Sequence, residues 1–240
     1  MKSVLITGAT SGIGESLAKV YAKKGYQVYA CGRNHDKLTM LANEYPSVTP
    51  LQFDITDKNA VASILAADIE LDHIILNAGT CEYIDDAKQF DGALFERVIY
   101  TNLIAIGYCL EAWLNQLKPN GQLGLMSSSA IYVPLTRAEA YGASKAAITY
   151  LAKTLSIDLA KEGVGVSAIH PGFVETPLTD KNDFAMPSRI TSSEAALAIY
   201  DGMHKRHYDI HFPKRFTLVL KIFSMLPFAL WRKLAIRMIK

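Results

Sequence analysis

A glycine-rich turn between a strand and a helix is the feature of this chain that most constrains its fold. The apolar run Val4-Leu5-Ile6 predicts a strand, and the apolar residues within 17–21 recur at helical spacing. Between them stands Gly8-Ala9-Thr10-Ser11-Gly12-Ile13-Gly14. Glycines allow a tight turn and let backbone amides approach a pyrophosphate, which the positive end of the next helix attracts. A plain loop is the alternative, but the position between strand and helix favours nucleotide binding.

Strands and helices are expected to alternate along the rest of the chain. The expected strands are 3–7, 27–31, 49–53, 73–77, 121–127, 164–169 and 208–212. The expected helices are 12–24, 35–44, 57–67, 90–118, 139–162 and 192–206. This alternation predicts an α/β protein with a doubly wound Rossmann fold, in which helices cover both faces of a seven-stranded, mostly parallel sheet. We expect a single domain over 1–212, a C-terminal helical tail over 213–240, and ligands beyond the carboxyl ends of the strands.

The length and the cysteines fit one domain in a reducing cytoplasm. A chain of 240 residues, half of them apolar, can form one large α/β core. Cys31, Cys81 and Cys109 are too widely spaced for a metal site or a disulfide framework, so each is interpreted as a small core residue. No metal is expected. No signal peptide is expected ahead of a strand that begins near Ser3.

A tyrosine and a lysine in the expected helix 139–162 point to acid–base chemistry. Tyr141 and Lys145 stand four residues apart, so their side chains share one helix face. A fixed ammonium stabilises a phenolate, and we therefore expect a lowered pKa for Tyr141. Ser128, 13 residues upstream of Tyr141, could bind the same substrate oxygen and is preferred over its neighbours Ser127 and Ser129 for this spacing. Alone the pair is weak support, because it arises by chance in many helices.

Further motifs follow the glycine turn in a set order. They are Asn77-Ala78-Gly79 after the apolar run 73–76, Asn102, Ser128, Tyr141 with Lys145, and Pro171-Gly172-Phe173-Val174-Glu175-Thr176. Together with Thr7-Gly8-x-x-x-Gly12-x-Gly14, they resemble the classical branch of the short-chain dehydrogenase/reductase family over about residues 3–212. The resemblance implies an oxidoreductase that interconverts a carbonyl and an alcohol by hydride transfer with a nicotinamide cofactor.

The resemblance also implies a role for each matching residue. Tyr141 would protonate the carbonyl oxygen or take the proton in the reverse direction. Lys145 would lower the Tyr141 pKa and bind the nicotinamide ribose, and Ser128 would polarise the carbonyl. Asn102 would order a water that connects Lys145 to solvent. In the loop that follows the sixth strand, Thr176 and the Val174 backbone would hold the nicotinamide carboxamide, and the Pro171-Gly172 pair would close over the ring.

The end of the second expected strand bears on the choice of cofactor. A cofactor without a 2′-phosphate favours an acidic residue here, whereas this chain has Gly32 followed by Arg33. A guanidinium binds a phosphate in a bidentate manner, so we expect NADP(H) rather than NAD(H). The alternative is that Arg33 only covers a solvent-exposed edge. Asp54-Ile55 resembles the pair that contacts the adenine; Asp54 could instead cap the next helix, although Asp57 suits that role better.

The C-terminal segment is unusually basic. Residues 203–240 hold nine Lys or Arg against one acid, Asp209, whereas the rest of the chain holds 16 against 22. Residues 216–227 are strongly apolar, and 228–240 look like a basic amphipathic helix with Pro227 as the break. Lys233, Arg237 and Lys240 share one expected face, with Leu230, Leu234 and Met238 on a neighbouring stripe. Residues 214–240 could contact a membrane surface, pack on a partner subunit or cover the substrate cleft.

The remaining expectations concern substrate and assembly. The loop 177–191 is only 15 residues long, which suggests an open cleft and an apolar, lipid-like carbonyl substrate. Tyr83 and Tyr132 could line this cleft or belong to the core. His73 and His170 are interpreted as hydrogen-bonded structural residues. A homodimer or homotetramer is expected through the helices that carry Asn102 and Tyr141, without nucleic acid, in the cytoplasm or peripherally at the inner membrane face.

Three alternative functions remain compatible with parts of the sequence. A nucleotide-binding scaffold or regulator without turnover would keep the fold, but the intact Ser128, Tyr141 and Lys145 argue against it. A membrane-surface protein could act mainly through its tail. An epimerase or dehydratase of the extended branch is disfavoured by the Gly-x-x-x-Gly-x-Gly spacing and by the lack of a large C-terminal substrate region.

Overall fold

Seven parallel strands form the sheet at the centre of the molecule. The computed structural model describes residues 1–182 and 184–238. The strands are β1 (Ser3–Thr7), β2 (Gln27–Gly32), β3 (Val48–Gln52), β4 (Leu71–Leu76), β5 (Leu117–Met126), β6 (Gly165–Pro171) and β9 (Asp209–Phe212). Their order across the sheet is β3-β2-β1-β4-β5-β6-β9, and every neighbouring pair is parallel. The order reverses direction at β1 and β4, where a doubly wound sheet opens a ligand site at its carboxyl edge.

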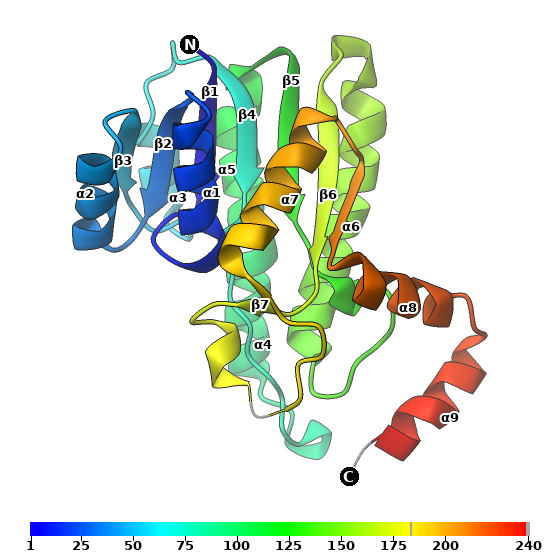
Figure 1. The fold of residues 1–240 in the computed structure, drawn as a ribbon. Coiled ribbons are helices and arrows are strands. Elements are labelled where there is room, and N and C mark those ends of the chain that lie inside the picture. The colour runs from blue at the N-terminus through cyan, green and yellow to red at the C-terminus, as the bar shows by residue number, and fades with distance from the viewer. Residues whose placement is uncertain (183, 239–240) are drawn as a thin grey trace.

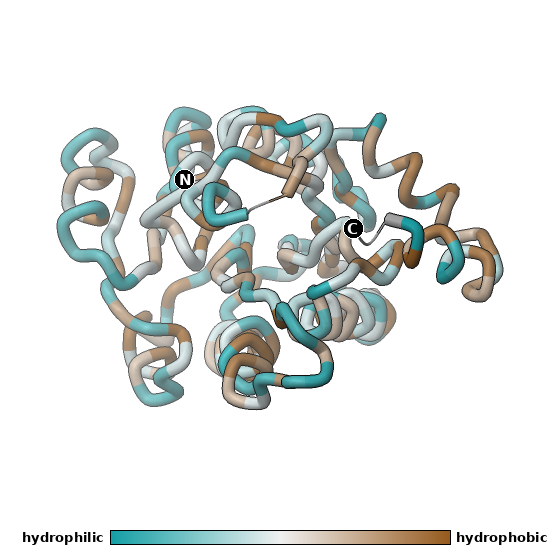
Figure 2. The backbone as a smooth tube through the Cα atoms, turned by 90° about the horizontal axis from the view of Figure 1, so that it is seen from below, coloured by the Kyte–Doolittle hydropathy of each residue, from teal (hydrophilic) through white to brown (hydrophobic). Residues whose placement is uncertain are grey.

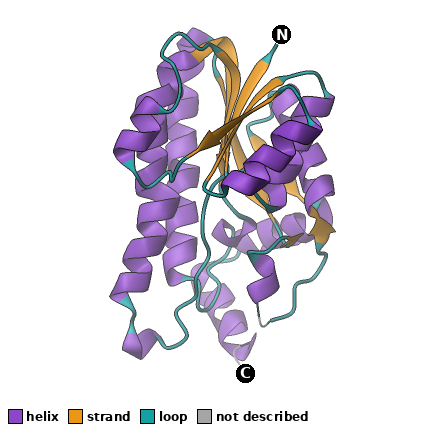
Figure 3. Ribbon diagram, turned by 90° about the vertical axis from the view of Figure 1, so that its left-hand side faces the viewer, coloured by secondary structure: helices purple, strands orange, loops and turns teal. Residues whose placement is uncertain are grey.

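Helices cover both faces of the sheet (Figures 1 and 3). They are α1 (Gly12–Lys23), α2 (His35–Glu44), α3 (Lys58–Ser63), α4 (Gly92–Ile99), α5 (Ala105–Trp113), α6 (Glu139–Asp158) and α7 (Ser192–His204). One core cluster joins α1, α2 and α7 to one face, and a second joins α3, α5 and α6 to the other. In β1, Val4 and Ile6 belong to the first cluster and Leu5 to the second, as the two-residue period of a strand requires. The predicted doubly wound fold is confirmed.

The expected helix 90–118 is confirmed as one helical stretch over Gly92–Gln116, but it is not a regular α-helix throughout. A π-helical turn, Tyr100–Ile104, separates α4 from α5, and it carries Asn102. The stretch Gly92–Gln116 is, within the described residues, the one helix long and apolar enough to cross a membrane. Trp113 and Cys109 of this stretch are buried in the core, whereas Tyr100 and Ile104 are exposed.

Other element ends differ from expectation for local reasons. β5 begins at Leu117 rather than 121, because Leu117 pairs with Leu71 before the register shifts and regular pairing starts at Gln122. α3 ends at Ser63, whose hydroxyl donates to the carbonyl of Asn59 and offers the backbone an alternative to further helix. Asp57 caps α3 as expected, because its carboxylate accepts from the amides of residues 59 and 60.

The loop between β6 and α7 holds a small ladder that sequence patterns did not predict. β7 (Val174–Glu175) pairs in parallel with β8 (Ile190–Thr191), which ties together the two ends of the 177–191 loop. Thr191 then begins α7 with a reciprocal capping box to Glu194. The loop is therefore fixed at its base.

The C-terminal segment forms two helices that extend beyond the sheet. α8 (Lys214–Ser224) follows β9 directly, and α9 (Phe228–Met238) follows Pro227, so the predicted break is confirmed. Figure 1 shows α8 beside the carboxyl end of β6 and α9 projecting away from the body of the protein. Val133, Leu220 and Trp231 form a small third core cluster between this segment and the main domain.

Candidate active site

A cavity of about 870 Å³ opens at the carboxyl edge of the sheet. It brings together nearly all residues that the sequence analysis selected. They are Gly8, Thr10, Ser11, Gly12, Ile13, Arg33, Asp54, Ile55, Asn77, Ala78, Gly79, Ser128, Tyr141, Lys145, Pro171, Gly172, Val174 and Thr176. Gly14 and Asn102 do not line the cavity, so they affect its shape only through the residues that do.

The glycine turn shapes one end of this cavity. Gly8 and Gly12 have φ angles of 70° and 55°, in the left-handed region that side chains rarely adopt. A Cβ on Gly14 would lie 2.1 Å from the carbonyl oxygen of Gly8, so only glycine fits there. Ser11 begins α1 without a side-chain cap, which leaves the amides of the first helical turn free of a local side-chain acceptor. This arrangement suits the pyrophosphate of a dinucleotide.

A clamp between β1 and β4 holds the turn in place. The Asn77 side chain donates to the Thr7 carbonyl over 2.9 Å, and the amides of Asn77 and Ala78 donate to the Thr7 hydroxyl over 2.9 and 3.0 Å. Thr7 was expected only as part of the glycine motif, and its role in this clamp was not predicted. Because the partners are 70 residues apart, no local pattern could have indicated it.

Tyr141 and Lys145 meet the strand-end serines at the floor of the cavity. The Lys145 ammonium donates to the Met126 carbonyl over 2.9 Å and lies 5.7 Å from the centroid of the Tyr141 ring. The Ser127 hydroxyl is committed to the Lys145 carbonyl and to Thr149, over 2.9 and 2.7 Å. Ser128 makes one local bond, accepting from the Ala130 amide, and lines the cavity. The geometry therefore leaves Ser128 the better placed hydroxyl for a ligand.

The expected lowering of the Tyr141 pKa is not seen. Desolvation raises the pKa of Tyr141 well above its ordinary value, and the Ser128 hydroxyl opposes this only in part. Burial also lowers the pKa of Lys145 from 10.5 to about 8. The helical spacing of the two residues predicted their common face, but desolvation of both groups depends on the surrounding fold. Tyr141 is consequently protonated at neutral pH, which suits a proton donor.

Replacing Lys145 with methionine is expected to stabilise the protein. Below about pH 8 the folded and unfolded states both carry the ammonium, and its burial destabilises the folded state. As the pH rises from about 8 to 10.5, only the folded state has lost the proton, so the free energy of unfolding of the wild type increases. We expect Lys145→Met to raise the free energy of unfolding at pH 7 by about 1–3 kcal/mol and to remove this pH dependence. Urea denaturation at pH 7 and pH 10 measures both effects, and a destabilised variant would contradict the account.

Asn102 supports the cavity from behind. Its side chain accepts from the Thr80 amide over 2.7 Å and donates to the Thr80 carbonyl and the Ser144 hydroxyl, over 2.9 and 3.0 Å. A Cβ on Gly79 would lie 2.9 Å from the Asn102 side-chain oxygen and 3.3 Å from the Lys145 ammonium, so these two groups flank Gly79. The side chain thus fixes the segment that follows Asn77. Thr80, which the sequence analysis did not select, also lines the cavity.

Arg33 and Asp54 lie at the opposite rim of the cavity. The Arg33 side chain is 80% exposed, and its guanidinium lies 3.4 Å from the Asp54 carboxylate. Asp54 also accepts from the amide and hydroxyl of Thr56, over 2.9 and 2.8 Å. Burial would raise the pKa of Asp54, but the bonds from Thr56 and the charge of Arg33 outweigh it and lower the pKa. Arg33 is free to reorient toward an anion, because the pairing is exposed and long.

The loop after β6 closes the cavity beside the glycine turn. A Cβ on Gly12 would lie 2.9 Å from the Thr176 methyl group, so the two segments touch. Gly172 donates its amide to the Phe212 carbonyl over 2.7 Å, and the Thr179 hydroxyl bonds the carbonyls of Val174 and Thr176. Lys181 of the same loop also lines the cavity, without a motif that could have identified it.

The remaining titratable residues have mostly structural partners. His73 is buried, bonds the Tyr21 hydroxyl over 2.9 Å and has its pKa lowered to about 4 by burial. His170 bonds Asp209 and Thr149, so the structural interpretation of both histidines is confirmed. Cys31 and Cys109 are buried in the core, but Cys81 is only partly buried, which corrects that expectation. Within residues 1–182 and 184–238, no group of three His, Cys, Asp or Glu could hold a metal ion.

Comparison with known proteins agrees with this geometry. The family model described as short chain dehydrogenase matches residues 2–186. An oxidoreductase of Myxococcus xanthus is 32% identical over 236 residues, which cover 94% of this chain and 93% of that protein. The structure of a short-chain dehydrogenase from Sphingobium yanoikuyae in complex with NADPH has 25% identity and a TM-score of 0.79, with 95% and 97% of the two chains covered. A Burkholderia phymatum structure in complex with NAD has 18% identity and a TM-score of 0.82, with 92% of each chain covered.

A doubly wound sheet with a cavity at its carboxyl edge is the arrangement that binds a dinucleotide, and the family match makes the chain an oxidoreductase of the type that uses a nicotinamide cofactor. More narrowly, the chain belongs to the short-chain dehydrogenase/reductase family.

Proposed function

We propose that this protein is an NADP(H)-dependent oxidoreductase that interconverts a carbonyl and an alcohol on an apolar substrate. The proposal rests on one observation above all. Ser128, Tyr141 and Lys145 stand together on the floor of a cavity whose far rim carries an open helix N-terminus and Arg33. The cavity thus combines an acid–base group with two elements that can bind anions. A dinucleotide bound next to a carbonyl substrate requires both.

The residues of the cavity have different roles in the proposed reaction. Bound cofactor supplies or accepts the hydride. Tyr141, protonated at neutral pH, donates its proton to the carbonyl oxygen, and Ser128 offers a second hydroxyl to the same atom. Lys145 sits behind Tyr141 with its charge near the developing phenolate, and binds ribose hydroxyls. Asn102 holds the backbone beside Lys145, where an ordered water would return protons from solvent.

Other residues would hold the cofactor. The Gly8–Gly14 turn and the first amides of α1 would bind the pyrophosphate, and Asp54 with Ile55 the adenine. Asn77-Ala78-Gly79 would lie against the adenosine ribose side, and Pro171–Thr176 against the nicotinamide. The fit is good, because every one of these segments faces the cavity and Gly14 leaves no side chain to obstruct the turn.

Replacing Arg33 with alanine is expected to weaken NADPH binding by about tenfold or more and to leave NADH binding unchanged. The guanidinium at the cavity rim would lose its bond to the 2′-phosphate, and a charge-assisted hydrogen bond is worth about 1.5–3 kcal/mol. Fluorescence titration of both cofactors with wild type and Arg33→Ala measures the effect. Lys205→Ala, an exposed cation away from the cavity, is the matched control and should bind both cofactors as wild type does. A wild type that prefers NADH would contradict the assignment.

The walls of the substrate side support an apolar substrate. Pro177 and Leu178 line the cavity next to Thr176. A row of aromatic rings that lies outside the cavity lining runs from Tyr83 through Phe184 and Phe173 to Phe216, with centroids 5.6, 6.1 and 5.4 Å apart. Such a row offers apolar contact area for a long hydrocarbon group.

The assembly and location form part of the same proposal. Tyr100 and Ile104 in the π-helical turn, and Tyr150 and Ile157 on α6, are large apolar side chains left exposed on the helices that carry Asn102 and Tyr141. They support a homodimer or homotetramer through these helices. We place the protein in the cytoplasm, with residues 214–240 in peripheral contact with the inner membrane face.

A further inference from the structure

The tail helices have an inner side that is firmly held by the main domain. The Trp231 indole of α9 is buried and donates to the Pro134 carbonyl over 3.0 Å. Thr217 and Leu220 of α8 are buried as well, and the Thr217 hydroxyl bonds His211 over 2.7 Å. These contacts attach α8 and α9 to the domain, and they define which sides of the two helices remain open.

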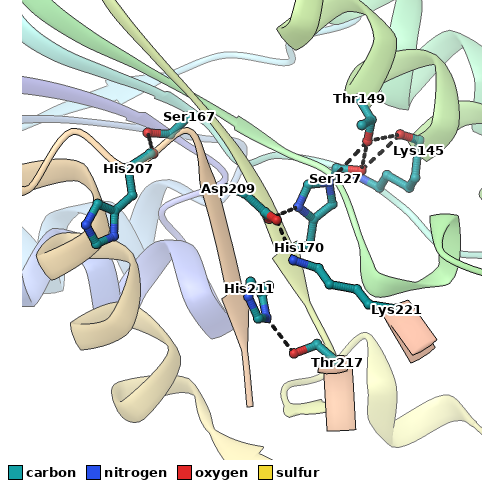
Figure 4. A network of polar contacts seen from close by, with 10 residues as sticks. All are labelled: Ser127, Lys145, Thr149, Ser167, His170, His207, Asp209, His211, Thr217 and Lys221. Atoms are coloured by element: carbon teal, nitrogen blue, oxygen red, sulfur yellow. Dashed lines mark hydrogen bonds and ion pairs between the residues drawn. The ribbon is translucent and has the colours of Figure 1, made fainter. Parts of the chain in front are cut away.

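A partly buried polar network continues from this inner side into the domain (Figure 4). The Lys221 ammonium of α8 binds the Asp209 carboxylate and lies 5.3 Å from the centroid of the Tyr132 ring. Asp209 also bonds His170 over 2.9 Å, and His170 reaches the Thr149 hydroxyl at 3.3 Å. Lys221 is therefore a structural cation that holds α8 against the domain.

The outer side of the tail is apolar and exposed. We define the tail face as the exposed apolar side chains of α8, of α9 and of the segment between these two helices, together with the exposed cations beside those side chains. The apolar members are Leu218, Val219, Ile222, Met225, Phe228, Leu230, Leu234 and Ile236. They account for eight of the 20 large apolar side chains exposed in the described residues, although they lie within 19 residues of sequence. Figure 2 shows apolar and polar segments alternating along this part of the chain. Clustering of this kind marks an interaction site.

The side of α9 that contacts the domain was not predicted. Trp231 and Ala235 make this contact, whereas Leu230 and Leu234 belong to the stripe that was left open to a membrane, a subunit or the cleft. Leu230 and Leu234 are consequently 49% and 38% exposed. Met238 and Lys240, which completed the expected stripe and basic face, have side chains outside the described part.

The charges around the tail face are all positive. Lys214 and Arg215 at the start of α8, and Arg232, Lys233 and Arg237 on α9, are exposed. Residues 214–240 contain seven Lys or Arg and no Asp or Glu. Apolar side chains interleaved with cations are the combination that binds the headgroup region of an anionic bilayer, where each Lys or Arg contributes about 1 kcal/mol.

We propose that the tail face docks this protein on the surface of an anionic phospholipid bilayer. Two other occupants fit less well. A second copy meeting the same face across a two-fold axis would bring these unbalanced positive charges together. The substrate cleft is not covered by the tail either, since no described residue beyond Lys181 lines the cavity. The inference rests on the membrane contact proposed above for residues 214–240 and makes it specific to one face and one lipid class, and it stands or falls separately from the proposed reaction.

Docking of this kind also orients the cavity. Both the cavity and the tail lie at the carboxyl edge of the sheet, because α8 begins two residues after β9 ends there. A protein bound through the tail face therefore holds the aromatic row that ends at Phe216 near the bilayer, where apolar carbonyl compounds dissolve.

Co-sedimentation of the full-length protein with vesicles tests the proposal. The vesicles are phosphatidylcholine alone and phosphatidylcholine with phosphatidylglycerol. One variant, Arg232→Gln with Lys233→Gln, removes charge, and a second, Ile222→Glu with Phe228→Glu, removes apolar contact. Lys37→Gln with Met40→Glu changes an exposed cation and an exposed apolar residue on α2 and is the matched control.

We expect wild type and the α2 control to bind the anionic vesicles only, with affinity that falls as salt is added. Each tail variant should bind roughly tenfold or more weakly. Absent binding to anionic vesicles, equal binding to neutral vesicles, or full binding by both tail variants would overturn the proposal. A wild-type dimer that the Ile222→Glu, Phe228→Glu variant converts to a monomer, without vesicle binding, would assign the face to a second copy. NADPH titration of the same samples shows separately whether the cofactor proposal holds.

Discussion

Replacing Tyr141 with phenylalanine is expected to lower the rate of NADPH-dependent carbonyl reduction by about 10²–10⁴-fold, the usual contribution of a general acid. The Tyr141 ring lies beside the Lys145 ammonium, its hydroxyl interacts with Ser128, and it carries its proton at neutral pH. Phenylalanine keeps the ring and its packing, so affinity for NADPH should stay close to that of the wild type. Steady-state rates and a cofactor titration on the same preparation separate these two effects.

Tyr150 offers a matched control on the same helix. It lies nine residues after Tyr141 on α6 and is 74% exposed, so Tyr150→Phe should retain wild-type activity. The proposed role of Tyr141 would be contradicted if Tyr141→Phe kept a tenth or more of the wild-type rate, or if both variants lost activity to the same extent.

Replacing Gly14 with alanine should abolish NADPH binding and destabilise the fold by about 3 kcal/mol or more, as overpacking against backbone does. The new methyl group would lie 2.1 Å from the Gly8 carbonyl oxygen and 2.6 Å from the Asn77 side-chain nitrogen. The Asn77 side chain belongs to the clamp between β1 and β4, and the Gly8 carbonyl is part of the glycine turn itself, so neither can move without opening the turn. Thermal unfolding should show a melting temperature lower by roughly 6–12 °C for a chain of this size.

Gly107 is the matched control for this substitution. It lies inside α5, is exposed, and has no atom within 4 Å of the position of a Cβ. Gly107→Ala should stabilise the protein slightly, by about 0.5–1 kcal/mol, through helix propensity. If Gly14→Ala melts at the wild-type temperature and binds NADPH normally, the close packing of the turn has been misjudged.

Local patterns predicted the parts of the site that lie at the ends of strands. The glycine turn and Asn77-Ala78-Gly79 each follow a short strand, and Tyr141 and Lys145 lie about one helical turn apart. Each of these patterns can be recognised within a single short segment of the sequence. A parallel sheet then gathers such segments at one edge, so their meeting in one cavity could be expected without knowing any contact.

Features that depend on distant contacts were beyond sequence patterns. The Thr7 hydroxyl binds amides 70 residues away, and the π-helical turn that carries Asn102 interrupts a stretch whose apolar period is helical throughout. The pKa of Tyr141 was expected to fall because Lys145 is near, yet desolvation by the assembled core raises it. Likewise, the sequence showed that the tail is rich in apolar residues. Which side of it is exposed became clear only from the structure, in which the Trp231 indole donates to the Pro134 carbonyl.

The most direct test of the proposed function is to measure hydride transfer itself. Purified wild-type protein is incubated with NADPH and a series of aliphatic aldehydes and ketones, and the NADPH consumed is compared with the alcohol formed by mass spectrometry. The account predicts equal amounts of the two for at least one long-chain carbonyl compound, and neither above background with Tyr141→Phe. NADPH consumption without alcohol, or alcohol formation that persists in Tyr141→Phe, would contradict it.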